Sequence, residues 1–177
     1  MASGVAARNE PGALGDKVLL KLVGRFLGCF AALFAIIVWL GARTRLVMEL
    51  MAATAGAATA LMNLTGVVAT HAGAMITVPG RRLMIGADCT GVMIVALLVS
   101  LVLAYPVRIS SKVIGVLVGI LAVYGANLAR LVLIAHISRA PDMLFNVAHD
   151  FLFQVGMVAV AIAVWAVWLS FARARES

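Results

Sequence analysis

The stretch Lys112–Ile137, KVIGVLVGILAVYGANLARLVLIAHI, decides the fold of this chain. As a helix it would be about 39 Å long at 1.5 Å per residue, more than the roughly 30 Å hydrocarbon core of a bilayer. Its only charged residues are Lys112 at one end and Arg130 near the other. We therefore expect a transmembrane helix here, and Gly115 and Gly119 would let a neighbouring helix approach it closely.

Three further apolar segments on either side of this stretch predict membrane spans, over residues 24–41, 91–107 and 147–171. Residues 46–66 are rich in Ala and Thr and predict an amphipathic helix lying at the interface. Between residues 67 and 86, β-branched residues and the Pro79-Gly80 turn signal predict a small extracytoplasmic hairpin. The expected fold is an all-α polytopic membrane protein, a four-helix transmembrane bundle with an interfacial helix and a hairpin.

The composition points the same way. Of the 177 residues, 64% are hydrophobic and 12% charged, which excludes a water-soluble globule. The net charge of +7 is spread in small groups between the apolar runs, not gathered with aromatic residues as in a nucleic-acid binder. We expect a polar cytoplasmic N-terminus over residues 1–18 and a single membrane domain over 19–177. The first apolar run reads as an uncleaved signal anchor, because no clear small-x-small site follows it.

The distribution of Lys and Arg predicts the orientation. If residues 46–66 do not cross the membrane, both termini are cytoplasmic, with eight basic residues inside and five outside; if they do cross, the count is six inside and seven outside. The four-span arrangement is therefore preferred. The eight are Arg8, Lys17, Lys21, Arg25, Arg108, Lys112, Arg173 and Arg175, and the five are Arg43, Arg45, Arg81, Arg82 and Arg139.

Three chemically active residues are expected to share one face of the membrane. Cys89 precedes the span 91–107, Arg130 lies about 27 Å beyond Lys112, and His149 begins the last span after Asn146, a plausible cap. Two helical hairpins bring all three to the same side, which the charge count makes extracytoplasmic. A thiol, a base and a cationic partner for an oxyanion are the groups that cysteine acyl transfer needs.

Neighbouring residues could support these three. A helix N-terminus and a nearby guanidinium would favour the Cys89 thiolate. Asn127 lies on the same helical face as Arg130 and could orient it, and Asp88 could cap a helix that begins near Thr90.

Each of these residues also has a plainer interpretation. Arg130 could snorkel to the headgroups, Cys89 could be inert, and His149 could be an interfacial anchor. Among the remaining candidates, Cys29 reads as a small buried hydrophobe, His71 as a surface residue and His136 as an interfacial anchor. No metal site is expected, because the histidines and cysteines lack ligand spacing. No Gly-x-Ser-x-Gly or His-Glu-x-x-His occurs, which disfavours a serine or metalloprotease.

The ordered set of motifs resembles the exosortase/archaeosortase family of membrane cysteine transpeptidases. The similarity spans roughly residues 46–171, with Val78-Pro79-Gly80 in the approach to the cysteine and Thr90 where the family more often has Ser. The chain is most similar to short exosortases such as the exosortase H type. The motifs are Asp88-Cys89-Thr90-Gly91-Val92, Asn127-Leu128-Ala129-Arg130-Leu131 and Ala148-His149.

This resemblance implies that Cys89 is the nucleophile, Arg130 the catalytic arginine and His149 the catalytic histidine, with no cofactor. The implied substrates are secreted proteins that carry a C-terminal motif, a transmembrane helix and a basic tail. They would be cleaved at the outer face of the cytoplasmic membrane, where the chain also contacts lipids; no nucleic acid is involved. The alternative function is a non-enzymatic membrane subunit that binds a lipid or a partner helix, in which replacing Cys89 would be silent.

Overall fold

The computed structural model describes residues 11–148 and 153–175, and in these ranges the chain is mostly helical with one small sheet. This confirms the predicted fold class. The helices are α1 (Pro11–Arg43), α2 (Leu46–Leu64), the short 3₁₀ helix η1 (Asp88–Thr90), α3 (Val92–Ala104), α4 (Ile109–His136), α5 (Asp142–Asn146) and α6 (Phe153–Ala174). The strands are β1 (Thr70–Ala72), β2 (Met75–Val78) and β3 (Arg81–Met84).

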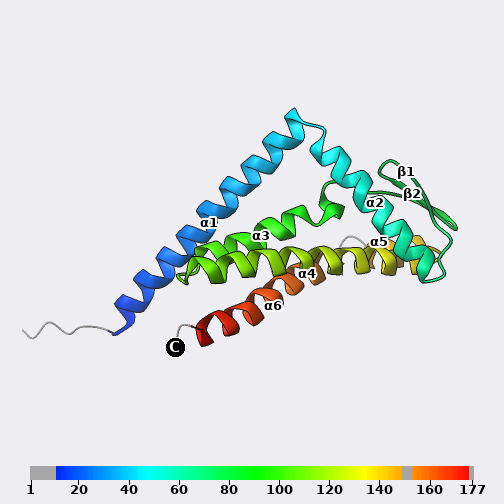
Figure 1. Ribbon diagram of the computed structural model, residues 1–177. Helices are drawn as coiled ribbons and strands as arrows, with labels where there is room; N and C mark the ends of the chain where they lie inside the picture. The colour runs from blue at the N-terminus through cyan, green and yellow to red at the C-terminus, as the bar shows by residue number, and fades with distance from the viewer. Residues whose placement is uncertain (1–10, 149–152, 176–177) are drawn as a thin grey trace, which may run out of the picture.

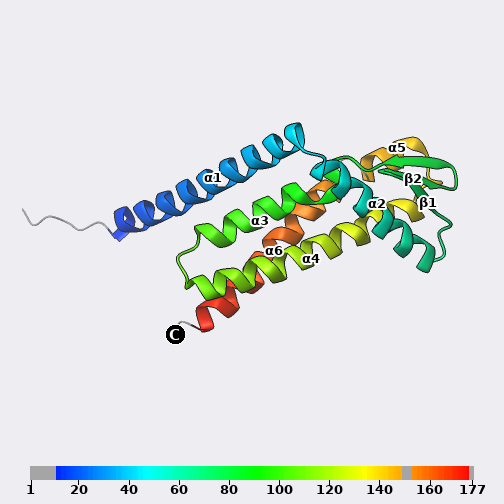
Figure 2. The same cartoon turned by 45° about the horizontal axis from the view of Figure 1, so that its top comes forward.

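The helices α3, α4 and α6 run alongside one another and form the body of the molecule (Figure 1). The sheet, α5 and the second half of α2 gather at one end of this bundle, while the C-terminus lies at the opposite end (Figures 1 and 2). Helix α1 packs along α3, and no residue of its apolar stretch is buried inside the protein. Apolar side chains that face away from the protein are what a lipid environment requires.

Two apolar clusters hold the bundle together. One joins α3, α4 and α6 through buried residues such as Leu98, Val123 and Ala161. The other joins α2, the sheet and the end of α4, and it contains Met62, Ile76, Ile134 and also Cys89. The second cluster packs the sheet onto the helices and therefore fixes the position of the segment that carries the cysteine.

One face of α4 is buried at nearly every fourth residue, which is the spacing of a single helical stripe. Ser111, Gly115, Gly119, Val123 and Asn127 lie on this face, and Leu131 continues it. A Cβ atom at Gly115 would collide with the indole of Trp168, and one at Gly119 with the side chain of Leu98. The expected role of these two glycines in close helix packing is thus confirmed, with α6 and α3 as the partners.

The predicted hairpin is part of a three-stranded antiparallel sheet in the order β1-β2-β3. Gly80, with φ of +88°, makes the β2–β3 turn that the Pro79-Gly80 pair predicts, and Gly73, with φ of +57°, makes the turn before it. In β2, Ile76 and Val78 are buried while Thr77 is exposed, so one face of the sheet packs on the helices. Strand β1 cannot be distinguished from its surroundings in the sequence, because three residues are too few for a pattern.

The lengths of the helices differ from the predicted spans. Helices α1, α2, α4 and α6 are long and apolar enough to cross a membrane, whereas α3 has only 13 residues. Its predicted span of 91–107 ends early because Pro106 cannot continue a helix. The interfacial placement of α2 stays a prediction, since its 19 residues would also suffice to cross.

The segment before α6 differs as well. We expected one helix over residues 147–171 with Asn146 as its cap, but Asn146 is itself helical, as the last residue of α5, and residues 147 and 148 continue in a helical conformation. Pro141 is the N-cap of α5, and its carbonyl accepts the first helical hydrogen bond, from the backbone N–H of Phe145 (3.0 Å). The capping role of Asn146 is therefore wrong. His149 lies outside the described residues.

We predict that Gly119→Leu lowers the melting temperature of the detergent-solubilised protein, whereas Gly125→Leu leaves it nearly unchanged. A side chain at 119 must displace Leu98, and overpacking of this kind costs about 1–3 kcal/mol. Gly125 has no atom within 4 Å of the position a Cβ would take, so it serves as the matched control on the same helix. Thermal unfolding followed by circular dichroism measures both, and equal melting temperatures would contradict the packing described above.

Candidate active site

Cys89 lies in a tight turn between the sheet and α3. Its backbone N–H donates to the carbonyl of Gly86 (3.0 Å), and the hydroxyl of Thr90 donates to the carbonyl of Ala87 (2.6 Å). Gly91 follows with φ of +77°, a conformation that only glycine adopts without strain. These contacts hold Cys89 in a fixed position ahead of α3, with 4% of its surface exposed.

Asn127 connects this turn to α4. Its side-chain amide donates to the carbonyl of Cys89 over 2.8 Å, and the whole residue is buried. A Cβ at Gly91 would lie only 3.3 Å from the Asn127 side chain, so the glycine also allows α4 to come this close. Asn127 therefore orients the cysteine segment itself, which is a more direct role than the expected one of orienting Arg130.

Arg130 is buried one turn further along the same face of α4, with 6% of its surface exposed. Its Nε atom is enclosed and has no hydrogen-bond partner among residues 11–148 and 153–175, and the same holds for Oδ1 of Asn127. A buried polar atom without a partner costs about 1–3 kcal/mol. These two atoms are thus available to a bound group that can supply a donor and an acceptor.

The pKa of Cys89 is raised, whereas we expected the surroundings to favour the thiolate. Burial raises the pKa of the Cys89 thiol, and the neighbouring carboxylate of Asp88 raises it further. The backbone of Gly86 and the guanidinium of Arg130 lower the pKa, but they do not outweigh these two effects. The thiol is therefore mostly protonated at neutral pH. The expected help from a helix N-terminus is small because α3 begins only at Val92, three residues later.

Asp88 acts on the thiol and does not cap a helix. Its Oδ2 atom lies 3.9 Å from Sγ of Cys89, which donates to it, and no side-chain hydrogen bond caps η1 or α3. The predicted capping role is therefore wrong. Thr90 closes the turn as described, and it is buried.

A cavity of about 200 Å³ opens beside Cys89. Its walls come from β3, the end of α4 and α5, and they are mostly apolar, with Arg82 at the edge. The other lining residues are Leu83, Met84, Ile85, Leu131, Ile134 and Phe145. An apolar group bound in this cavity would contact Cys89.

Arg81 ties the sheet to the α4–α5 connection, and the sequence analysis missed this role. Its guanidinium donates to the carbonyls of Ser138 (2.8 Å) and Ala140 (3.0 Å) and to the carboxylate of Asp142 (2.6 Å). It also lies 4.0 Å from the ring centre of Phe145. Nothing in the sequence marked Arg81 beyond its charge, because its partners are about 60 residues away and two of them are backbone carbonyls.

The remaining predicted residues lie away from the cysteine or outside the described ranges. His71 is exposed on β1 beside Gly56 of α2, and His136 is exposed with Nδ1 at 2.9 Å from the carbonyl of Val132. Cys29 is partly buried on α1. In residues 11–148 and 153–175, no group of three or more Cys, His, Asp and Glu side chains could hold a metal ion. The structure thus brings together Cys89, Asp88, Thr90, Asn127 and Arg130 and leaves His149 untested.

A protein-family model for transmembrane exosortase (Exosortase_EpsH) matches residues 13–169. This chain belongs to the transmembrane exosortase family. With its long apolar helices, the exosortase is a multi-pass membrane protein. Comparisons with curated proteins and with solved structures give no match. The match covers the whole described site, so the family resemblance inferred from the motifs is confirmed.

We predict that the reaction of Cys89 with N-ethylmaleimide accelerates when Asp88 is replaced by Asn. The carboxylate opposes the thiolate, so its removal should lower the thiol pKa and increase the rate near neutral pH, about tenfold for each pKa unit. Both variants also carry Cys29→Ala, so that Cys89 is the only thiol. Mass spectrometry then measures the rate of N-ethylmaleimide addition to Cys89 at a series of pH values from neutral to alkaline. Asp16→Asn, an exposed carboxylate on α1, is the control, and an unchanged rate profile in Asp88→Asn would contradict the assigned cause.

Proposed function

We propose that this exosortase is a cysteine transpeptidase that cleaves C-terminal sorting signals of secreted proteins. The observation that supports it most is the joint position of Cys89 and Arg130, a nucleophile and a cation buried at the same end of the bundle. Asn127, on the helix that carries Arg130, donates to the Cys89 carbonyl. Cysteine acyl transfer needs a thiol as nucleophile and, close to it, a cationic or hydrogen-bonding partner for the oxyanion.

In the proposed reaction, the Cys89 sulfur attacks the scissile carbonyl carbon while the thiol proton passes to His149. A base is needed because the resting thiol is mostly protonated. Arg130 stabilises the oxyanion, and the tetrahedral intermediate then breaks its C–N bond. His149 returns the proton to the leaving amine, leaving a thioester on Cys89, which an acceptor amine or water resolves.

The substrate's transmembrane helix would lie against the bundle, with its cleavage site at the level of Cys89. The mostly apolar lining of the 200 Å³ cavity favours an apolar side chain beside the scissile bond. The charge count favours cytoplasmic termini and an active site facing the extracytoplasmic side. Arg130, with its head buried, is unlike a snorkelling residue, which keeps its head in water.

We predict that Cys89→Ala abolishes processing of a co-expressed, tagged protein that ends in a short motif, an apolar helix and a basic cluster. Membrane insertion should be unchanged, because alanine fills nearly the same buried volume. Immunoblotting of the tag distinguishes precursor from product. Cys29→Ala on α1 is the matched control and should process normally, and product formation by the Cys89→Ala protein would rule out the transpeptidase.

We predict that Arg130→Lys inserts normally but processes the substrate on the order of 10²-fold more slowly, the scale of losing one oxyanion donor. A lysine ammonium on a flexible stem lacks the planar set of donors of a guanidinium. Initial rates at matched expression measure the effect, with the exposed Arg139→Lys as control. Near-normal turnover in Arg130→Lys would contradict an oxyanion-binding role and favour the interpretation of Arg130 as a membrane anchor.

A further inference from the structure

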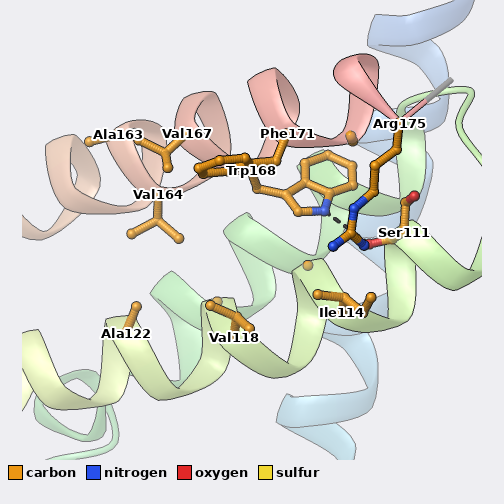
Figure 3. A pocket seen from close by; sticks show the side chains of 13 residues that line it. Ser111, Ile114, Val118, Ala122, Ala163, Val164, Val167, Trp168, Phe171 and Arg175 are labelled. Atoms are coloured by element: carbon orange, nitrogen blue, oxygen red, sulfur yellow. Dashed lines mark hydrogen bonds between the residues drawn. The ribbon is translucent and has the colours of Figure 1, made fainter. Parts of the chain in front are cut away.

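A groove of about 490 Å³ runs between α4 and α6, at the end of the bundle opposite to Cys89. Figure 3 shows the two helices with side chains that reach into the space between them. Ser111 and Arg175 lie at one end of the groove, and Ala122 and Ala163 at the other (Figure 3). None of the residues around Cys89 lines it, so it is a separate feature of the molecule.

The groove has the surface of an acyl-chain site. Gly115 and Gly119 line the groove on α4 and let Trp168 and Leu98 pack closely against this helix. The indole of Trp168 forms a wall, held by a 2.9 Å hydrogen bond from its Nε1 to the carbonyl of Ser111 (Figure 3). Apart from Ser111 and Arg175 at its end, the lining is apolar, with Trp168 presenting its ring. A flexible hydrocarbon chain could adapt to this irregular apolar space and contact its lining closely. A rigid helix would leave part of the same space unfilled.

The length of the groove corresponds to one leaflet. Ser111 and Ala122 are 11 residues apart on α4, which is about 16 Å along a helix. This is half of the roughly 30 Å hydrocarbon thickness. With Lys112 at the membrane surface, as its charge predicts, the groove would extend to about the midplane, as a single lipid tail does. A transmembrane helix would need a contact surface about twice as long.

The membrane-surface end of the groove is cationic. Arg175 lines it directly, and Lys112 and Arg173 adjoin the lining residues Ser111 and Ala172 in the sequence. Lys112 donates to the carbonyl of Leu103 and Arg173 to the hydroxyl of Tyr105, so both partners are neutral. Within the described ranges, no carboxylate forms an ion pair with any of the three. This charge attracts a phosphate and repels the basic tail of a sorting signal.

We propose that the α4–α6 groove is a binding site for an anionic phospholipid of the leaflet at this end. One acyl chain lies against Trp168 and the two glycines, and the headgroup phosphate binds the guanidinium of Arg175. The lipid fills the space between α4 and α6 and supports the packing of the helix that carries Asn127 and Arg130.

Trp168 provides a direct test, because brominated acyl chains quench a tryptophan that they contact. The full-length protein with Trp39→Phe and Trp165→Phe, so that Trp168 alone fluoresces, is reconstituted into phosphatidylcholine and phosphatidylglycerol vesicles. Either lipid is then supplied in dibrominated form at equal mole fraction. We expect the relative affinity of phosphatidylglycerol at Trp168 to exceed that of phosphatidylcholine by about fivefold, the scale of one basic residue near an anionic surface.

Variants and a second reporter make the result specific. Arg175→Gln should abolish the preference, while Arg25→Gln, an exposed arginine on α1, should not. Ala122→Phe should reduce quenching by filling the groove, whereas Ala129→Phe, exposed on the same helix but outside the groove, should not.

A protein with Trp39 alone, exposed on α1, should show no preference. Equal quenching of Trp168 by both lipids, as expected if a substrate helix or bulk lipid covers the groove, would overturn the proposal.

Discussion

The hydrogen bond from the Asn127 amide to the Cys89 carbonyl is the constraint on which the candidate site depends. Cys89 belongs to a turn outside the bundle helices, and this bond fixes that turn to the C-terminal half of the buried face of α4. A buried amide bond contributes only about 1 kcal/mol net, but leaving its carbonyl unpaired would cost more. Because Arg130 follows Asn127 by one helical turn, the same bond sets the distance between the thiol and the guanidinium.

The Arg81 guanidinium makes the second connection, at the outer surface of the site. It joins β3 to the backbone that follows α4 and to Asp142 at the start of α5. Charge-assisted bonds to several acceptors hold a planar group in one orientation. The two connections differ in kind: Asn127 joins the cysteine turn to a membrane helix, whereas Arg81 joins the sheet to α5, whose Phe145 forms a wall of the cavity.

Much of this arrangement could be predicted from the sequence, and the exceptions have physical reasons. The convergence of Cys89, Asn127 and Arg130 follows from helix length and from the short turn at 105–108 that reverses the chain. The pKa direction of Cys89 could not be predicted, because it depends on burial and on where the Asp88 carboxylate points. The connections of Arg81 and the helix α5 could not be predicted, since both depend on contacts between segments about 60 residues apart. His149 remains a prediction from the motif.

The shortness of α3 has a consequence for the membrane itself. Its 13 residues span only about 20 Å, while the neighbouring helices α4 and α6 are long enough to cross a full bilayer. Such a hydrophobic mismatch is relieved by local thinning of the bilayer or by tilt. Thinning beside α3 would bring the turn that carries Cys89 closer to the bilayer midplane than the ends of α4 and α6. In the proposed reaction, the thickness of the host membrane would then affect which residue of a substrate helix lies level with the Cys89 thiol.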